Sequence, residues 1–324
     1  MLLEPQEAAA AVRSPGARNE LSVLRDRPFI AIDLRKGDDG AELTPLRELP
    51  AVIIGVGAPH DACDIAVAST EALEPVVVAV GANPQAAVTL VQLLRLSSRL
   101  DPHAGLVAES LAYATLQGGR EFRAWLARRG RRVRRAGPEP PVISEREGST
   151  LALILNRPRL HNLYDATMRD ALVDGLSVAA HDRSIDQLVL RGRGKSFCAG
   201  GDLAEFGTVS DPATAHLIRT TANAAPYLLA VAGRLRAEVH GAVVGAGLEL
   251  AAFASRVIAA PDAIFQLPEV SMGLVPGAGG TVSVPARIGR HRAAWLMLTA
   301  ARIDAATALD WGLIDEVSPE RVSG

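Results

Sequence analysis

The sequence predicts an α/β protein with a mostly parallel sheet and helices on its faces. Short apolar runs typical of strands, such as QLVLRG at 187–192, alternate along the chain with longer segments whose apolar residues recur at helical spacing. This alternation is typical of strand–helix–strand units, whose strands pair in parallel. The chain has 324 residues and is 48% hydrophobic and 22% charged, which is enough apolar material for a sizeable core.

The first part of the chain is expected to be a leader followed by a small module. Residues 1–27 indicate a flexible leader, because an alanine run is followed by Ser-Pro-Gly. Residues 28–130 form a predicted α/β module of unknown role. Its strand candidates are 29–34, 51–56 and 76–81, and its helices are expected over 84–100 and 104–130, with Gly118-Gly119 as a break in the second. Asn83 and Pro84 suit the N-cap and first position of the earlier helix.

Residues 131–141 are expected to form a linker. The segment RRGRRVRRAGPEPP at 128–141 opens with six arginines in eight positions and ends in Pro-Glu-Pro-Pro. Two interpretations stay open: a solvated linker, or a contact with a polyanion such as nucleic acid or a phosphate. The net charge of −2 favours the linker, and we do not expect the protein to bind nucleic acid.

Residues 142–324 are predicted to form the larger, catalytic domain. Strands are expected at 151–158, 187–192, 235–241, 256–260 and 264–268, and helices at 165–182, 245–254, 293–303 and 304–315.

The turn SFCAGGDL at 196–203 follows a predicted buried strand and offers small side chains. One interpretation is a tight strand-to-helix turn; the other is that backbone N–H groups act there as donors, since small residues let a ligand approach closely. A second glycine turn at 245–247 precedes a helix, whose first N–H groups are unpaired and carry partial positive charge. The amides of Ala199 and Ala246 could therefore hold one carbonyl oxygen that becomes an oxyanion.

Two glutamates complete this candidate site. Glu249 lies in GLELAA and Glu269 in LPEVSMG, both among apolar residues that tend to raise the pKa of a carboxyl group toward working pH. If the fold brings them together, one could take a proton from a shared water while the other gives a proton to carbon. The alternative for either residue alone is a salt bridge or an exposed edge position.

These motifs resemble the crotonase (enoyl-CoA hydratase/isomerase) superfamily. The resemblance is carried by SFCAGGDL, VHGAVVGAGLELAAFAS and FQLPEVSMGLVPGAGGT, and it extends over residues 143–317. It implies a crotonase-like spiral β-β-α core, here with an extra N-terminal α/β module and a truncated C-terminal helical region, since the chain stops at Gly324 where crotonases continue for further helices. The helices at 84–100 and 104–130 could replace that missing cover or its subunit contacts.

The resemblance implies an enzyme that adds water across the C2–C3 double bond of a 2-enoyl-CoA thioester. Ala199 and Ala246 match the oxyanion-hole positions, and Glu249 and Glu269 match the catalytic carboxylates. Positions matching the substrate-binding and CoA-binding turns are Cys198, Gly200, Gly201, Asp202, Leu203, Gly245 and Gly277. Alternatives that stay open are enoyl-CoA isomerisation, decarboxylation, thioester hydrolysis, or a non-catalytic or RNA-binding relative.

Other expectations concern partners and location. The resemblance implies a homo-oligomer, a trimer or hexamer, that uses acyl-CoA as substrate and needs no cofactor. Two cysteines, no basic-then-apolar leader and short apolar runs predict no disulfide framework, no metal site, no membrane contact and a cytoplasmic location. Cys198 is expected to be a packed thiol, Asp202 a cap, and His240 a structural hydrogen-bonding residue.

Overall fold

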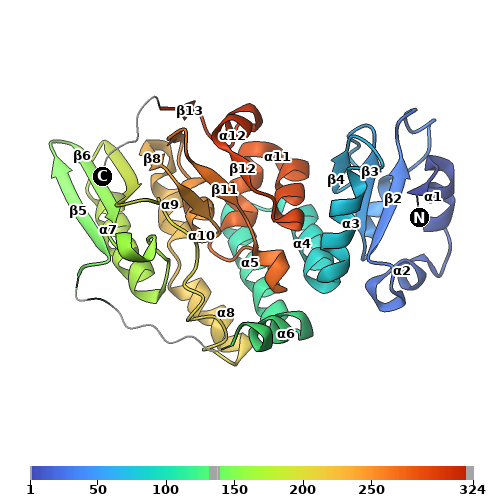
Figure 1. Ribbon diagram of the computed structural model, residues 1–324, viewed down its shortest axis with the longest axis horizontal. Helices are drawn as coiled ribbons and strands as arrows, with labels where there is room; N and C mark the ends of the chain where they lie inside the picture. Colours follow the sequence, from blue (N-terminus) through green and yellow to red (C-terminus); the bar gives the residue numbers. More distant parts are fainter. Residues whose placement is uncertain (1, 131–136, 138, 319–324) are drawn as a thin grey trace.

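The computed structural model describes residues 2–130, 137 and 139–318. Within them the chain forms a four-stranded, a six-stranded and a three-stranded sheet with helices packed around all three (Figure 1). Most strand pairs are parallel, which confirms the α/β class predicted from the sequence.

The four-stranded sheet near the N-terminus is wholly parallel, in the order β1-β2-β3-β4. Its strands are β1 Leu2–Leu3, β2 Phe29–Asp33, β3 Val52–Val56 and β4 Ile65–Val67. The predicted strands at 29–34 and 51–56 are confirmed. All five residues of β3 are buried, so this strand is the centre of the module.

Residues 2–27 do not form the loose leader that the sequence suggested. Strand β1 pairs with β2, and the helices α1 (Pro5–Val12) and α2 (Ala17–Glu20) follow it. Ala8 and Ala17 lie in a buried cluster with Ile32 of β2. The alanine run is therefore the core-facing surface of a helix.

The strand predicted at 76–81 is also wrong, because these residues lie within helix α3 (Leu73–Ala82). Val76 and Val80 are fully buried, whereas Val78 is 64% exposed. In a strand all three side chains would share one face, whereas in a helix residues four apart share a face. The five consecutive apolar residues at 76–80 misled the assignment, since short apolar runs suit either structure.

Three helices link this sheet to the rest of the chain: α4 Pro84–Ser97, α5 Pro102–Gln117 and α6 Arg120–Arg129. The helix predicted over 104–130 breaks at Gly118-Gly119 into α5 and α6. Asp101 caps α5, where its side chain accepts hydrogen bonds from two backbone amides. Asn83 precedes Pro84 as predicted, but its side chain makes no cap bond and donates to the Ser271 carbonyl (3.4 Å).

The larger part of the chain is built on the six-stranded sheet, in the order β13-β10-β8-β7-β6-β5. Only β5 and β6 pair antiparallel. The strands are β5 Val142–Glu147, β6 Thr150–Leu155, β7 Gln187–Gly192, β8 Leu235–Val239, β10 Arg256–Ala259 and β13 Glu316–Val317. The helices are α7 Ala166–His181, α8 Pro212–Thr221, α9 Ala225–Val231, α10 Ala246–Ala251, α11 Gly280–Thr299 and α12 Ala305–Trp311.

A repeated step from one sheet to the other produces the predicted spiral. Strand β8 is followed at once by β9 (Ala242–Val244), and β10 by β11 (Ile264–Gln266), so each long strand is continued by a short strand in the three-stranded sheet. Both steps run in parallel, with β8 beside β10 and β9 beside β11. The third strand there is β12 (Ile303–Asp304), antiparallel to β11.

The N-terminal helices pack directly on the larger part. Helices α3, α4 and α5 contact α11, and Figure 1 shows α4 between the four-stranded sheet and α11. One buried cluster runs from Val52 in β3 through Leu90 in α4 to Met297 in α11. Buried Asp64 also accepts from Arg95 of α4 (Nε–Oδ1 2.8 Å) and forms an ion pair with Arg290 of α11 (3.3 Å). The predicted boundary at 131–141, whose residues 131–136 and 138 lie outside the described set, therefore separates segments that share a core.

Among the described residues, no single helix is long and apolar enough to cross a membrane; only α3 and α4 taken together pass that test, and they meet at a 108° bend.

Candidate functional site

The two predicted glycine turns lie side by side. The Cys198 amide donates to the Ala242 carbonyl (3.1 Å), and the Val244 amide donates to the Cys198 carbonyl (3.0 Å). A Cβ on Gly247 would come within 2.5 Å of the Cys198 carbonyl oxygen, so only glycine fits there. The sequence pattern thus places the backbone of 198–201 against the start of α10.

The Ala199 amide is not an open donor, contrary to the sequence-based expectation. It donates to the carbonyl of His161 (2.9 Å), in the turn after β6. Two residues further on, the Gly201 amide donates no hydrogen bond to any described residue. The Ala246 amide opens α10, where the first N–H groups have no partner inside the helix. The backbone donors left without a partner among the described residues are therefore those of Gly200 and Gly201 in the first turn and of Ala246 in the second.

Glu269 begins a short 3₁₀ helix, Glu269–Met272, directly after Pro268. Its side chain is 8% exposed, and its Oε2 has no hydrogen-bond partner among the described residues. A Cβ on Gly245, whose φ is +50°, would lie 2.7 Å from Glu269 Oε1, so this glycine lets the carboxyl group reach the turn. Burial raises the pKa of Glu269 to about 8, so the group holds its proton at neutral pH.

Glu249 is the second buried carboxyl group, on α10 and 2% exposed. Its Oε2 accepts from the amides of Ala278 (2.7 Å) and Gly280 (2.8 Å) at the start of α11. Burial and the neighbouring Glu269 raise its pKa well above the usual value, whereas the two amide donors oppose that shift. Of the two acids, only Glu249 therefore accepts hydrogen bonds from the amides of another segment.

A third buried acid, Glu109 of α5, holds the same turn from the opposite side. Its Oε1 accepts from the Gly279 amide (2.8 Å), and its Oε2 accepts from the Thr281 amide (2.8 Å) and hydroxyl (2.7 Å). Four successive amides at 278–281 thus alternate between Glu249 and Glu109. Burial raises the pKa of Glu109 to about 7. A side chain from the N-terminal segment therefore fixes the turn that orients Glu249.

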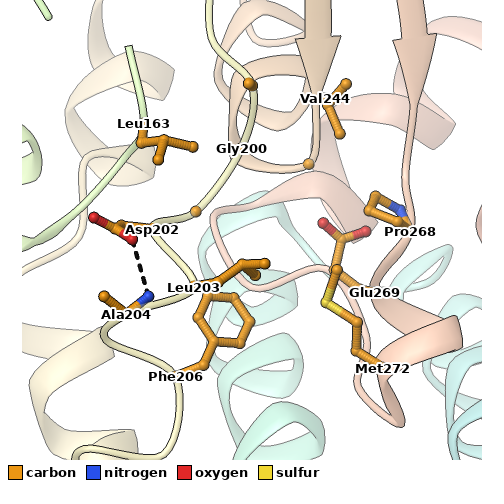
Figure 2. A pocket seen from close by; sticks show the side chains of 13 residues that line it. Leu163, Gly200, Asp202, Leu203, Ala204, Phe206, Val244, Pro268, Glu269 and Met272 are labelled. Carbon is orange, nitrogen blue, oxygen red and sulfur yellow. Dashed lines mark hydrogen bonds between the residues drawn. The ribbon is translucent and has the colours of Figure 1, made fainter. Parts of the chain in front are cut away.

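A first cavity of about 540 Å³ opens beside the glycine turns. Figure 2 shows the Glu269 carboxyl group pointing into the space beside Gly200 and Val244. Of the predicted binding positions, Gly200, Gly201, Asp202, Leu203 and Gly245 line this cavity, and so does Ala199, one of the predicted oxyanion-hole positions.

A second cavity, of about 560 Å³, adjoins the first, since Gly201, Phe206 and Glu269 line both. Glu249, Ala246 and Gly277 line it as well, so the structure brings both predicted acids into one space. Tyr113 and Gln117 of α5 and Phe122 of α6 form part of its wall. The expectation that the N-terminal helices cover this site therefore holds for the segment 104–130, whereas no residue of 84–100 lines either cavity. The role of both helices in subunit contacts stays a prediction.

The remaining candidates are structural. Cys198 is fully buried, and burial raises the pKa of its thiol to about 12, so it is no nucleophile at neutral pH. Asp202 Oδ1 accepts from the Ala204 amide (2.9 Å), as expected of a cap (Figure 2). His240 Nε2 lies 3.0 Å from the Gly194 carbonyl oxygen, the expected structural bond. Within the part of the chain that the structure describes, no group of three His, Cys, Asp or Glu side chains could hold a metal ion.

Comparison with known proteins decides the family. The model of the enoyl-CoA hydratase/isomerase family matches residues 145–323, more than half of the chain. The chain belongs to this family.

Among relatives in the family, the 2,3-dehydroadipyl-CoA hydratase of Escherichia coli K12 is 36% identical over 178 residues, which are 55% of this chain and 69% of that protein. The mitochondrial enoyl-CoA hydratase of Pongo abelii is 32% identical, over 55% of this chain and 62% of its own length. An enoyl-CoA hydratase structure from Thermoplasma volcanium aligns with a TM-score of 0.50 at 33% identity, over 56% of this chain and 73% of that one. The chain thus spans about two thirds of these family members, and the crotonase fold predicted from the motifs is confirmed.

Sequence reasoning missed three features of the site. It could not tell that the Ala199 amide in CAGGD is already hydrogen-bonded, because its acceptor, the His161 carbonyl, lies in a distant turn. It also passed over Glu109, although a signal existed: Leu106, Glu109, Tyr113 and Leu116 share one helical face, so Glu109 interrupts an otherwise apolar stripe. The third feature is Arg219, which lines the second cavity from α8.

Proposed function

We propose that the protein hydrates the C2–C3 double bond of a 2-enoyl-CoA thioester. The observation that supports this most is the pair of buried acids, Glu249 and Glu269, in one cavity beside free backbone donors of the two turns. Hydration needs a base for water, an acid for carbon and a site for the enolate oxygen, and these groups supply all three.

The thioester oxygen would be held by the amides of Gly201 and Ala246. Both lie on turns that the Cys198 hydrogen bonds keep together, and neither needs a side chain larger than a methyl group. Negative charge that develops on this oxygen would meet two fixed donors and the partial positive charge at the start of α10. We assign the acyl chain to the second cavity and the pantetheine arm to the first, since Gly201 lines both.

The hydrogen bonds of the two acids suggest different roles. Glu249, held by two amides, would act as the base that takes a proton from water as the oxygen adds to C3. Glu269, whose Oε2 has no donor to stabilise a charge, would hold the proton and deliver it to C2. The overall step adds H and OH and requires no electron transfer, so we propose that no resident cofactor takes part. We also propose a cytoplasmic location, in keeping with a chain that has only two cysteines.

The test is incubation with a panel of 2-enoyl-CoA thioesters, following loss of the conjugated thioester absorbance. We expect turnover by the natural protein and a loss of about 10²- to 10⁴-fold in E269Q, with acyl-CoA binding retained. Absence of turnover across the panel despite acyl-CoA binding would overturn the proposal.

Isomerisation of 3-enoyl-CoA to 2-enoyl-CoA is a second candidate, since Glu269 lines both cavities and accepts no hydrogen bond from another described residue. The variant E249Q separates the two reactions. Loss of hydration with isomerisation retained would show that Glu269 suffices for the second reaction, whereas loss of both would leave hydration as the better account.

We also propose a homo-oligomer, a trimer or hexamer. Val107 and Leu111 of α5 and Leu217 of α8 are 46%, 52% and 63% exposed, and these two helices pack together. Light scattering after size exclusion would measure the mass; a monomer at micromolar concentration would contradict this.

A further inference from the structure

A half-buried arginine lines the second cavity without a close ion pair to any carboxylate of the described residues. Arg219 of α8 stacks over the ring of Tyr113, with its guanidinium carbon 4.3 Å from the ring centre. Its hydrogen bonds go to neutral groups and are long: 3.2 Å to Gln117 Oε1 and 3.4–3.5 Å to Ser110. Among the described residues it forms no ion pair within 4 Å. Burial lowers the pKa of this guanidinium below its usual value, although the nearby Tyr113 and Glu109 oppose that shift.

The second arginine of the cavity wall has a different environment. Arg169 pairs with the exposed Asp170 at 2.7 Å, so its charge is already matched. Arg219 is therefore the cation of this cavity whose fork of N–H donors is least satisfied. A guanidinium in that state binds a carboxylate with two parallel hydrogen bonds, and burial strengthens such a pair.

The position of Arg219 relates it to the reacting carbons. The ring of Tyr113 lies against Gly277, where an added Cβ would come within 2.6 Å of the ring. Gly277 precedes Ala278, whose amide holds Glu249. Arg219, Glu249 and Glu269 all line the second cavity, to which we assign the acyl chain.

We propose that the acyl group carries a carboxylate at its far end and that Arg219 binds it. The substrate class is the mono-CoA thioester of an unsaturated dicarboxylic acid. This inference rests on the assignment of the second cavity to the acyl chain in the proposed function. Tyr113 and Gln117, both from α5, hold the guanidinium in place, so the N-terminal segment contributes to selectivity.

A matched pair of substrates tests the inference: hex-2-enedioyl-CoA and hex-2-enoyl-CoA, which differ only in the terminal carboxylate. We expect the natural protein to favour the diacid in kcat/KM by roughly 10- to 100-fold, as a charged hydrogen-bonded pair predicts. In R219M this ratio should fall to one or below, and R219K should keep part of it. The control R169M should keep the ratio.

Equal kcat/KM for the two thioesters in the natural protein, or an unchanged ratio in R219M, would overturn the inference while leaving hydration intact. If neither thioester is turned over, the proposed function fails instead, and the inference is then tested by calorimetric binding of the unreactive adipoyl-CoA and hexanoyl-CoA to the natural protein. Tighter binding of adipoyl-CoA, lost in R219M, would support it; equal binding would refute it.

Discussion

At the scale of single residues, the proton of Glu269 is the one that the proposed hydration would deliver to carbon. Its pKa of about 8 results from burial, and its Oε2 has no donor that would stabilise the charged form. Delivery of a proton to C2 requires the protonated carboxyl group. We therefore expect kcat/KM for hydration to fall as pH rises through about 8, and a pH–rate profile measured to pH 10 checks this.

The same group should tie stability to pH. The folded-state pKa lies above the usual 4.5, so between about pH 4.5 and 8 the unfolded chain has lost this proton while the folded chain keeps it. The contribution of Glu269 to stability is full below about pH 4.5 and is lost as pH rises through 8. Denaturant titrations should show that the free energy of unfolding of E269Q, compared with that of the natural protein, is higher at pH 9 than at pH 6. Either of two results would contradict a raised pKa for Glu269: a kcat/KM that rises through pH 8, or a relative stability of E269Q that is the same at pH 9 as at pH 6.

Most of the site residues that the sequence predicted were recognised from their residue type and their immediate neighbours. Glu249 and Glu269 were recognisable because acids in apolar segments are unusual, and Ala246 because it opens a helix after glycine. The choice between Ala199 and Gly201 depended on a carbonyl of His161 thirty-eight residues away. A sequence pattern identifies the turn, but it does not show which of its amides is already used.

At the scale of elements, the site depends on a junction between α5 and the start of α11. Glu109 and Glu249 divide the four amides at 278–281 between them, so α5 shares in placing the Glu249 carboxyl group. The sequence predicted α5 but not this junction, because a contact between residues 109 and 281 leaves no local periodicity. For the same reason 76–81 was misassigned: only packing distinguishes an apolar helix turn from a strand.

Replacing Glu109 by Gln should lower kcat by about 10- to 100-fold with KM little changed, because one carboxyl oxygen that accepts an amide bond becomes a donor and the turn shifts. The Glu109 charge also raises the pKa of Glu269, so its removal should move the alkaline limb of the rate profile to lower pH. Kinetics from pH 6 to 10 measure both effects.

The matched control is E121Q, since Glu121 similarly accepts two amides at the start of α4 (2.8 and 2.9 Å) but lies on another turn. We expect E121Q to leave the alkaline limb in place. An unmoved limb in E109Q, or an equal shift in E121Q, would reduce Glu109 to a structural role.

At the scale of the whole molecule, the N-terminal segment and the larger part should unfold together. A linker-like stretch at 131–141 had indicated separate domains, yet the buried cluster runs from β3 through α4 to α11. The buried Asp64 forms ion pairs with Arg95 and Arg290, which belong to helices on either side of this junction. It also accepts from the Ile53 amide (2.8 Å) in β3.

Replacing Asp64 by Asn should lower the free energy of unfolding by about 3–5 kcal/mol, because two guanidinium groups lose their buried counter-charge. The fluorescence of Trp125, Trp295 and Trp311 and the far-ultraviolet circular dichroism should follow one denaturant transition, since the parts share a core. R18A is the control: Arg18 and Glu48 form an ion pair with side chains 69% and 68% exposed, and we expect its loss to cost at most about 1 kcal/mol. Two separate transitions, or a D64N variant no less stable than R18A, would show that the two parts fold independently and that α5 is a detachable cover over the cavity.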